Sequence, residues 1–197
     1  MRFVAISDTH GCHRQLDLPA GDVLIHAGDV CDRGSHDQVE DFFLWMSDLP
    51  FSHKCLIWGN HDFDLSTNRV LFPVEMPSSI TRLNDSECLI GGLRIWGVPS
   101  PANKRGEDWS RIPPGIDVLV THRPPIGILD RPKMRGPQGS RGLKKRLLDV
   151  TPRVHVFGHI HHGYGQETRN QTRYINASLY RSSLKRLVNS PIVFDLE

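Results

Sequence analysis

Aspartate and histidine side chains recur directly after short apolar runs in this sequence. Asp8 and His10 follow the run 4–7, and Asp29 follows the run 23–27. Asp8 and His10 are separated by one residue where a buried strand runs into a loop. Both side chains can therefore point to one place in space, as a first pair of metal ligands must. The D-x-H triplet alone is a weak signal, because it occurs by chance in many soluble chains.

Later apolar runs end in the same kind of residue. The run 55–58 leads to Asn60, His61 and Asp62, the strand 117–121 to His122, and the run 154–157 to His159 and His161. His61 followed by Asp62 is typical of an imidazole with an orienting carboxylate. A mixed Asp, Asn and His set without thiolates suits divalent ions such as manganese, iron, zinc or nickel. The set supplies more ligands than one ion needs, so the sequence predicts two ions.

The elements that would position these residues are mostly short strands. Strands separated by loops, with few helices, predict a layered α/β or α+β domain. A helix is predicted to about Leu49, with Ser35 and Gln38 as a capping box, and a second helix over 143–149. The pair Gly91 and Gly92 between two strand-like runs predicts a hairpin. Residues 99–116 are rich in proline and glycine and are predicted to form a long surface loop.

Length and charge narrow the classes of protein. A chain of 197 residues can bury its own core without disulfides or a structural metal, so we expect one domain over residues 1–197. Lysine plus arginine number 24 against 22 acidic residues, a formal charge of +2 that argues neither for a nucleic-acid coat protein nor for an acidic partner. The N-terminus enters a strand at once and no apolar run reaches membrane-spanning length, so we expect a cytoplasmic protein without a membrane partner.

Two further segments lie beside the predicted site. The four cysteines lack C-x-x-C spacing, which excludes zinc-finger and thioredoxin motifs. Cys12 and Cys31 flank site loops and could form a redox-sensitive pair, or be two ordinary buried thiols. The basic loop 130–142 could be a solvated mobile segment or a lid over the substrate.

The motifs resemble those of a known family when they are taken in order. D-x-H, GD-x-x-D-x-G, GNHD, a histidine after a later strand and GH-x-H together resemble the calcineurin-like metallophosphoesterases. The stretches SDTHGCH, HAGDVCDRGS, GGLRIWGVP and VFGHIHHGYG look more like the branch of metallophosphoesterase-domain-containing proteins active on phosphodiesters and cyclic nucleotides. The resemblance spans the chain from Asp8 to His161. It implies a two-sheet β-sandwich flanked by helices.

The family pattern also implies roles for the site residues. It places one metal on Asp8, His10, Asp29 and His161, and the other on Asp29, Asn60, His122 and His159. Asp29 would then bridge the two ions, and a metal-bridging hydroxide would attack phosphorus. The pattern makes His61 the acid that protonates the leaving oxygen, with Asp62 orienting it. Arg33 stands where related phosphatases carry a phosphate-gripping arginine, although a structural salt bridge is an equal alternative.

The resemblance therefore implies a dinuclear-metal phosphodiesterase that hydrolyses a small nucleotide or cyclic-nucleotide diester. Mn²⁺ is the favoured metal, with Fe, Zn or Ni as alternatives. A phosphomonoesterase, including a protein phosphatase, and a metal-binding scaffold with little turnover are the other functions to test. Nucleic acid is a less favoured substrate, because the basic stretch 130–146 lacks interleaved aromatic residues.

Overall fold

The computed structural model describes residues 1–32, 35–62, 76–100, 108–131 and 136–197, which form two large β-sheets and two α-helices. The first sheet has the order β13 (Ile192–Asp195), β1 (Arg2–Ile6), β2 (Val23–His26), β3 (His53–Leu56) and β4 (Thr81–Arg82). The second has the order β5 (Ser86–Ile90), β6 (Leu93–Val98), β7 (Val118–Thr121), β8 (Val154–Phe157), β10 (Thr172–Asn176) and β9 (Gly165–Arg169). A small hairpin of β11 (Tyr180–Arg181) and β12 (Arg186–Leu187) lies apart from both.

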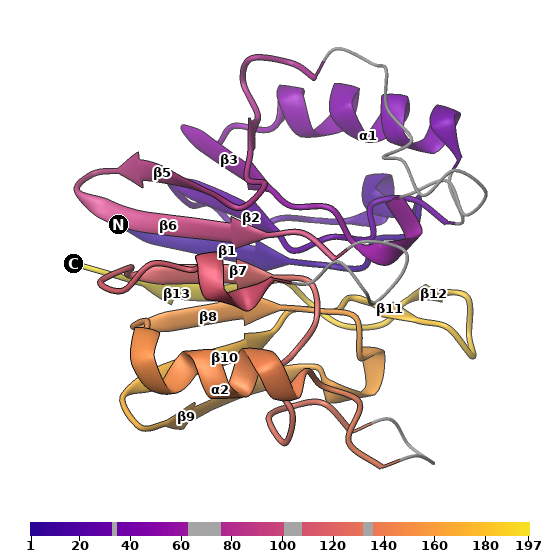
Figure 1. The fold of residues 1–197 in the computed structure, drawn as a ribbon. Coiled ribbons are helices and arrows are strands. Elements are labelled where there is room, and N and C mark those ends of the chain that lie inside the picture. Colours follow the sequence, from indigo (N-terminus) through magenta and orange to yellow (C-terminus); the bar gives the residue numbers. More distant parts are fainter. Residues whose placement is uncertain (33–34, 63–75, 101–107, 132–135) are drawn as a thin grey trace.

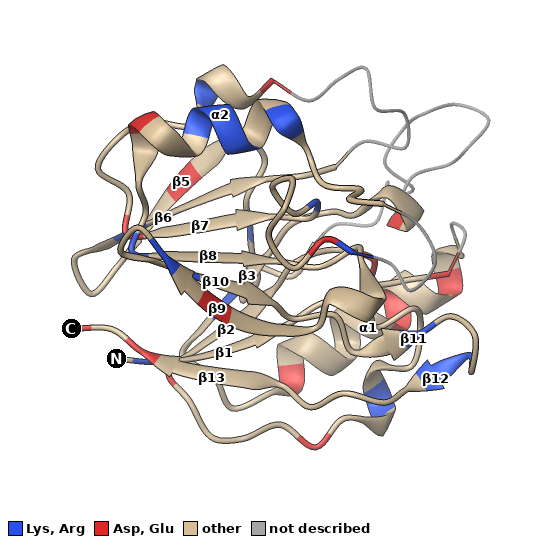
Figure 2. Ribbon diagram, turned by 90° about the horizontal axis from the view of Figure 1, so that it is seen from below, with Lys and Arg blue, Asp and Glu red and all other residues tan. Residues whose placement is uncertain are grey.

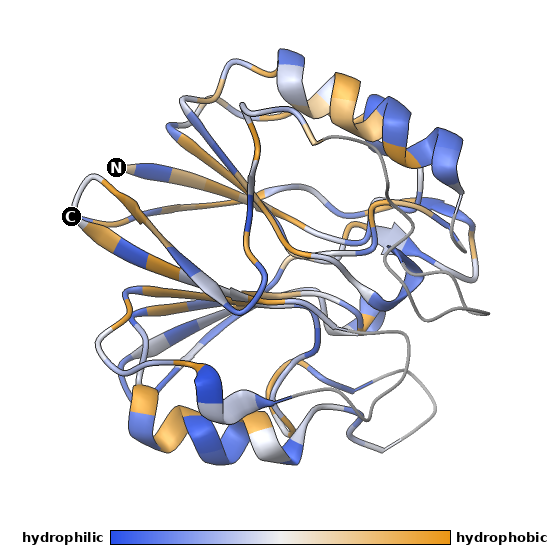
Figure 3. Cartoon of the chain, turned by 45° about the horizontal axis from the view of Figure 1, so that its top comes forward, coloured by the Kyte–Doolittle hydropathy of each residue, from blue (hydrophilic) through white to orange (hydrophobic). Residues whose placement is uncertain are grey.

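The two sheets pack face to face, and one helix covers the outer face of each (Figure 1). Alternate residues of β1 show how the layers are built. Phe3 and Ala5 belong to the core between the sheets, whereas Val4 and Ile6 pack in the cluster under α1 (His36–Asp48). Both faces of the central strands are therefore buried, which explains their continuous apolar sequence. The apolar strands lie inside the sandwich in Figure 3, and the predicted two-sheet sandwich flanked by helices is confirmed.

Helix α1 has the predicted start and apolar stripe. Ser35 is its N-cap, and the Ser35 hydroxyl accepts a hydrogen bond from the Gln38 backbone amide at 3.4 Å. The capping box is only half formed, because the Gln38 side-chain oxygen instead accepts from the Asp32 amide at 2.7 Å. The buried side of the helix consists of Val39, Phe42, Phe43 and Met46.

Helix α2 (Arg141–Val150) begins two residues before the predicted start, because Ser140 caps it by accepting from the Leu143 amide at 3.2 Å. Figure 2 shows the basic residues of this helix in blue; Arg141, Lys144 and Lys145 are exposed. Trp109 and Ile112 are buried against it. The prediction of a surface loop over 99–116 is therefore wrong for these positions, where a short 3₁₀ turn, Trp109–Arg111, covers the apolar face of α2.

Several strands carry too little signal in the sequence to be predicted. β4, β11 and β12 have two residues each, and most side chains of β9 are exposed and polar. β9 and β10 are joined by a tight hairpin in which Asn170 and Gln171 have positive φ angles of 46° and 69°. No helix among the described residues is long and apolar enough to cross a membrane.

Strand direction determines where the site can form. β1, β2 and β3 are mutually parallel in the first sheet, and β6, β7 and β8 are parallel in the second. The carboxyl ends of each set lie on one edge of its sheet, and both edges meet at the side of the molecule toward which β6 and β8 point in Figure 1. Loops that leave these strands can therefore converge from both sheets.

Candidate metal centre

Loops from both sheets bring the predicted ligands together. Asp8 and His10 follow β1, and the His161 ring comes from the 3₁₀ turn His161–Gly163 after β8. The Asp8 Oδ1 atom lies 3.1 Å from His161 Nε2. The His10 Nε2 atom lies 3.3 Å from the same nitrogen. Donor atoms of these three residues all lie within 4.8 Å of one another, close enough to share one ion.

A second group of donors lies beside the first. The donor atoms of Asp29, His122 and His159 also lie within 4.8 Å of one another. The Asn60 Oδ1 atom is 3.1 Å from His122 Nε2, so the side-chain amide faces this group. The structure thus brings together all of the predicted metal ligands, which are Asp8, His10, Asp29, Asn60, His122, His159 and His161.

Asp29 lies between the two groups. Its Oδ2 atom is 3.3 Å from His122 Nε2 and 3.8 Å from His10 Nε2. Its other oxygen, Oδ1, accepts a hydrogen bond from the His61 backbone amide at 2.9 Å, which fixes the plane of the carboxylate. One carboxylate oxygen is therefore directed toward imidazoles of both groups.

Hydrogen bonds outside the donor cluster hold the ligands in orientation. The His122 Nδ1 atom donates to the Ala27 carbonyl at 2.8 Å, so its Nε2 atom is the one that faces Asp29. The His161 Nδ1 atom lies 2.8 Å from the Ser182 hydroxyl, which directs Nε2 toward Asp8. Such partners fix which nitrogen of a histidine is free to bind a metal.

Asp8 is held by more hydrogen bonds than Asp29, the other carboxylate among the predicted ligands. The Ser178 hydroxyl donates to Asp8 Oδ2 at 2.8 Å, and the His159 amide donates to the same oxygen at 3.0 Å. Asp8 and Ser178 are both fully buried. Ser178 gave no signal in the sequence, because it follows the last recognisable motif by many residues.

The backbone at the ligands is strained. Asp8, His10, Asp29 and His159 have positive φ angles of 54°, 43°, 58° and 66°. Residues other than glycine seldom adopt this left-handed region, and it persists mainly where function requires a particular direction of the side chain. Two glycines make room for the carboxylates. A Cβ at Gly158 would collide with Asp8 Oδ2, and a Cβ at Gly59 would collide with Asp29 Oδ1.

Burial and mutual attraction shift the pKa values of the cluster in opposite directions. Burial acts to raise the pKa of Asp8, but the neighbouring His161 ring holds that pKa well below its usual value. Burial acts to lower the pKa of His122, but Asp29 raises it to about 9. Burial, with repulsion from His122, lowers the pKa of His159 to about 3. The cluster thus pairs carboxylates with imidazoles whose protons a divalent cation can replace.

The types of donor atom and their arrangement fit divalent metal ions. Imidazole nitrogens of different residues face one another at close range, and carboxylate and amide oxygens complete the set. Buried groups of this kind need a positive charge or protons to balance the carboxylates, and borderline-soft divalent ions accept both nitrogen and oxygen ligands.

His61 lies at the edge of the cluster, where its ring forms a third group of donors with His10 and Asp32, all within 4.8 Å of one another. Its side chain is 34% exposed, and its ring packs edge-on against His10 with centroids 4.8 Å apart. Its Nδ1 atom lies 3.6 Å from Asp32 Oδ1. Asp32, which stands in the GD-x-x-D-x-G motif, is therefore the carboxylate beside the imidazole.

The prediction that Asp62 orients His61 is wrong. The fully buried Asp62 carboxylate accepts hydrogen bonds from the backbone amides of Asp29, Val30, Cys31 and Gly59 at 2.9, 2.9, 3.2 and 2.8 Å. The 3₁₀ turn Asn60–Asp62 directs Asp62 inward while His61 stays at the surface of the cavity. Asp62 therefore joins the loops that carry Asp29 and Asn60. Burial and the charge of Asp29 raise the pKa of Asp62 to about 7.

The site opens into a cavity of about 240 Å³. Asp29, His61, His159 and His161 line it together with Ile160, His162 and Ser182. Tyr180 of β11 packs against His10 with ring centroids 4.6 Å apart. Arg33, predicted to bind phosphate, lies outside the described residues, as does part of the predicted lid 130–142.

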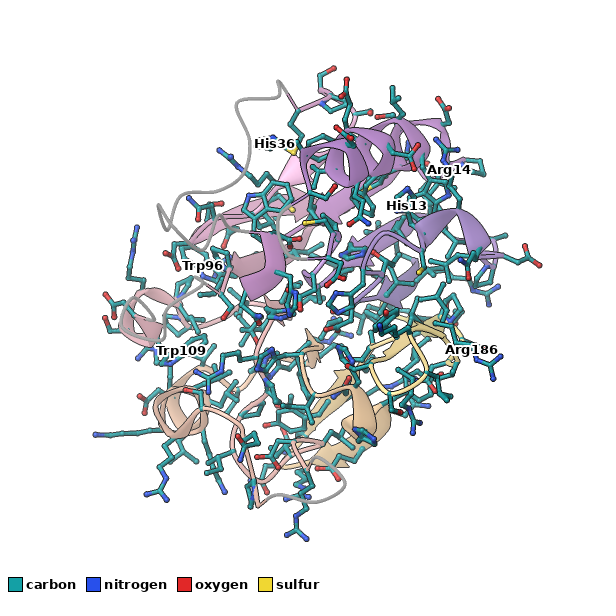
Figure 4. All side chains as sticks on the ribbon, turned by 90° about the vertical axis from the view of Figure 1, so that its right-hand side faces the viewer. His13, Arg14, His36, Trp96, Trp109 and Arg186 are labelled. Atoms are coloured by element: carbon teal, nitrogen blue, oxygen red, sulfur yellow. The ribbon has the colours of Figure 1, made fainter. Side chains whose placement is uncertain are left out.

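Other histidines and cysteines near the motifs have structural neighbours. The His13 Nε2 atom lies 2.9 Å from Asp41 of α1, and Arg14 pairs with the same carboxylate (Figure 4). The Cys31 Sγ atom lies 3.4 Å from Asp62 Oδ1, whereas the Cys12 Sγ atom lies 3.8 Å from the His10 carbonyl. These two thiols thus have different neighbours.

Two face-to-face sheets with Asp, Asn and His donors at the ends of strands from both form a candidate metal centre. Residues 1–163 match the model of the calcineurin-like phosphoesterases, and the chain belongs to this family. It is a phosphoesterase by family, and the resemblance derived from its motifs is confirmed.

Relatives extend the match over the whole chain. Human metallophosphoesterase domain-containing protein 1 is 38% identical over 231 aligned residues, covering 99% of this chain and 71% of that protein. The mouse protein of the same name gives the same figures. A crystal structure with 15% sequence identity aligns over 89% of both chains with a TM-score of 0.63, which supports the fold alone.

Proposed function

We propose that this chain is a dinuclear-metal phosphodiesterase that hydrolyses small nucleotide or cyclic-nucleotide diesters, with Mn²⁺ as the favoured metal. The observation that carries the proposal is the position of Asp29. Its Oδ2 atom faces His10 of one donor group and His122 of the other, as a carboxylate shared by two ions must. A site for one ion would not need ligands on both sides of this carboxylate.

The donor groups divide the ligands between the two ions. Asp8, His10 and His161 would hold one ion, and Asn60, His122 and His159 the other, with Asp29 common to both. Bound divalent ions supply Lewis-acid polarisation of the phosphoryl group and a water of lowered pKa.

The remaining residues donate a proton to the leaving group or hold the ligand loops in position. His61 reaches the cavity with its ring, and its Nδ1 atom faces the Asp32 carboxylate. That pairing would hold the ring in place, so that His61 can give a proton to the departing alkoxide oxygen. Asp62 keeps the Asp29 and Asn60 loops in register through its backbone hydrogen bonds. Arg33 remains a predicted phosphate ligand.

The size of the cavity supports a small substrate. A volume of about 240 Å³ suits a phosphate with compact groups attached rather than a folded protein segment. The partly exposed His162 lines the same cavity, so it is positioned to contact the group attached to phosphorus.

The test is hydrolysis by protein stripped with a chelator and then reloaded with one metal at a time. We expect Mn²⁺-loaded protein to hydrolyse bis-nitrophenyl phosphate and cyclic nucleotides faster than nitrophenyl phosphate. Asp29→Asn should lose bound metal and activity, whereas Asp149→Asn, at an exposed carboxylate on α2, should keep both. Faster monoester hydrolysis would indicate a phosphomonoesterase instead. Tight metal binding without hydrolysis of any ester would indicate a scaffold.

A further inference from the structure

Two cysteines face each other across the core between the sheets. Cys55 lies in β3 of the first sheet and Cys88 in β5 of the second, and their Sγ atoms are 3.8 Å apart. Cys55 is 1% exposed and belongs to the central core, whereas Cys88 is partly buried and packs against that core from the side. Both are free thiols.

We propose that Cys55 and Cys88 form a redox-active dithiol, a modification site that exchange with a low-molecular-weight disulfide such as oxidised glutathione converts into a disulfide between the sheets. The proposal is independent of the hydrolytic activity. It concerns a different pair from Cys12 and Cys31, whose sulfur atoms have different neighbours.

The distance between the sulfur atoms requires only a small closure. A disulfide has a sulfur–sulfur bond of about 2.05 Å, so the two atoms must approach by roughly 1.8 Å. Within the described parts of the chain, β5 is the edge strand of its sheet and pairs on one side only, with β6. β3 is next to the edge of the other sheet. Edge strands can shift more readily than central ones, so side-chain rotation with a small movement of β5 can supply the closure.

The exposure of the two thiols determines the order of the reaction. Cys88 is the more exposed of the two residues, and the hydrogen bond from the Cys55 thiol lowers the pKa of Cys88. The same contact, with burial, raises the pKa of Cys55. The Cys88 thiolate therefore attacks one sulfur of oxidised glutathione, forms a mixed disulfide and releases one glutathione thiolate.

The buried thiol completes the exchange. Cys55 gives its proton to the released glutathione thiolate and attacks the sulfur of Cys88, and the second glutathione leaves as a thiolate that takes a proton from water. The two protein thiols are then oxidised to one disulfide, and one glutathione disulfide is reduced to two thiols.

The cross-link would enclose part of the candidate metal centre. Cys55 and Cys88 are 33 positions apart, and the segment between them carries Asn60, His61 and Asp62. Closing a loop of this length restricts the unfolded chain, so the oxidised protein should melt higher by roughly 5–10 °C.

The experiment oxidises the full-length folded protein with oxidised glutathione and maps its disulfides by mass spectrometry without reduction. We expect a peptide pair joined through Cys55 and Cys88, reversal by dithiothreitol and a higher melting temperature. Cys55→Ser should stop at a glutathione adduct on Cys88. Cys12→Ser, which removes the other partly buried thiol, should form the cross-link as the wild-type protein does.

Other outcomes would overturn the proposal. A stable glutathione adduct on wild-type Cys88 with a free Cys55 thiol would show that the sulfur atoms cannot meet. A disulfide that involves Cys12 or Cys31, a cross-link that forms only in denaturant, or no oxidation at all would have the same consequence.

Discussion

The hydrogen bond from Ser178 to Asp8 gives a sharp test of how the candidate metal centre is built. Ser178→Ala removes one hydroxyl whose oxygen lies 2.8 Å from Asp8 Oδ2, at a position that is fully buried. Backbone contacts of residue 178 remain, including the bridge to Ser7 and the hydrogen bond from its amide to the Asn176 side chain. The change therefore isolates one hydrogen bond to a charged group.

The size of the effect follows from the type of bond. A hydrogen bond to a buried charged group contributes about 2 kcal/mol. For a domain of this size, each kcal/mol corresponds to roughly 2–4 °C, so the metal-free variant should melt about 4–8 °C lower. Asp8 keeps the amide of His159 as a donor but loses one constraint on its orientation. Metal affinity should therefore fall by roughly 10–100-fold, as is usual when a partner of a ligand is removed.

Two measurements separate the stability effect from the ligand effect. Thermal unfolding in chelator reports the first, and titration of the stripped protein with Mn²⁺ by calorimetry reports the second. Ser79→Ala, which removes an exposed hydroxyl that pairs with Ser47, is the matched control and should change neither. A Ser178→Ala protein that is less stable but binds Mn²⁺ as tightly as wild type would refute the reasoning that this bond orients Asp8.

Three further predictions concern the pH dependence of stability, a steric clash at a metal ligand, and proton transfer to the leaving group. Burial lowers the pKa of the fully buried His155 to about 3, so between pH 7 and 5 only the unfolded state takes up its proton. Over this range the free energy of unfolding of the wild-type protein, measured in urea, should fall by about 2 kcal/mol more than that of His155→Gln, and a constant difference between the two proteins would contradict this. Gly158→Ala places a methyl group against Asp8 Oδ2 and should abolish tight metal binding in the same titration, whereas Gly136→Ala, with open space around it, should not. His61→Ala should lower kcat/KM for cyclic nucleotides by roughly a hundred- to ten-thousand-fold but spare much of the bis-nitrophenyl phosphate activity, because nitrophenolate leaves without a proton. Equal losses for both substrates with metal still bound would show that His61 is not the acid that protonates the leaving group.

The proximity of the predicted ligands could be inferred from the sequence because its signal is topological. A ligand directly after an apolar strand lies at the carboxyl end of that strand, and parallel strands bring such ends together. Asp8, Asp29 and Asn60 follow parallel strands of one sheet, and His122 and His159 follow parallel strands of the other. Burial of the strands on both faces was equally readable from their continuous apolar sequence.

Features that depend on the path of short turns were not predictable. His61 and Asp62 are neighbours in sequence, but the turn sends one to the cavity and the other to buried backbone amides. Ser178 and Ser182 follow the last motif and contain no pattern that points to the site. Trp109 lies in a stretch rich in glycine and proline, where composition suggests exposure although packing buries it.

The contact between Cys55 and Cys88 likewise had no signal in the sequence. The two residues lie on strands of different sheets, so their proximity depends on how the two layers are superposed. The spacing of cysteines along a chain does not report such contacts between layers.

The division of the ligands between the two sheets has a consequence for the energetics of the whole domain. An ion held by Asp8 after a strand of the first sheet and His161 after a strand of the second would form a non-covalent cross-link between the two sheets. This cross-link would exist only while both sheets are folded. Its contribution to the free energy of unfolding grows with the logarithm of the free metal concentration, reaching about 2.7 kcal/mol at one hundred times the dissociation constant. The metal supply would therefore change the free energy that keeps the two layers of the sandwich together, apart from any reaction that the site performs.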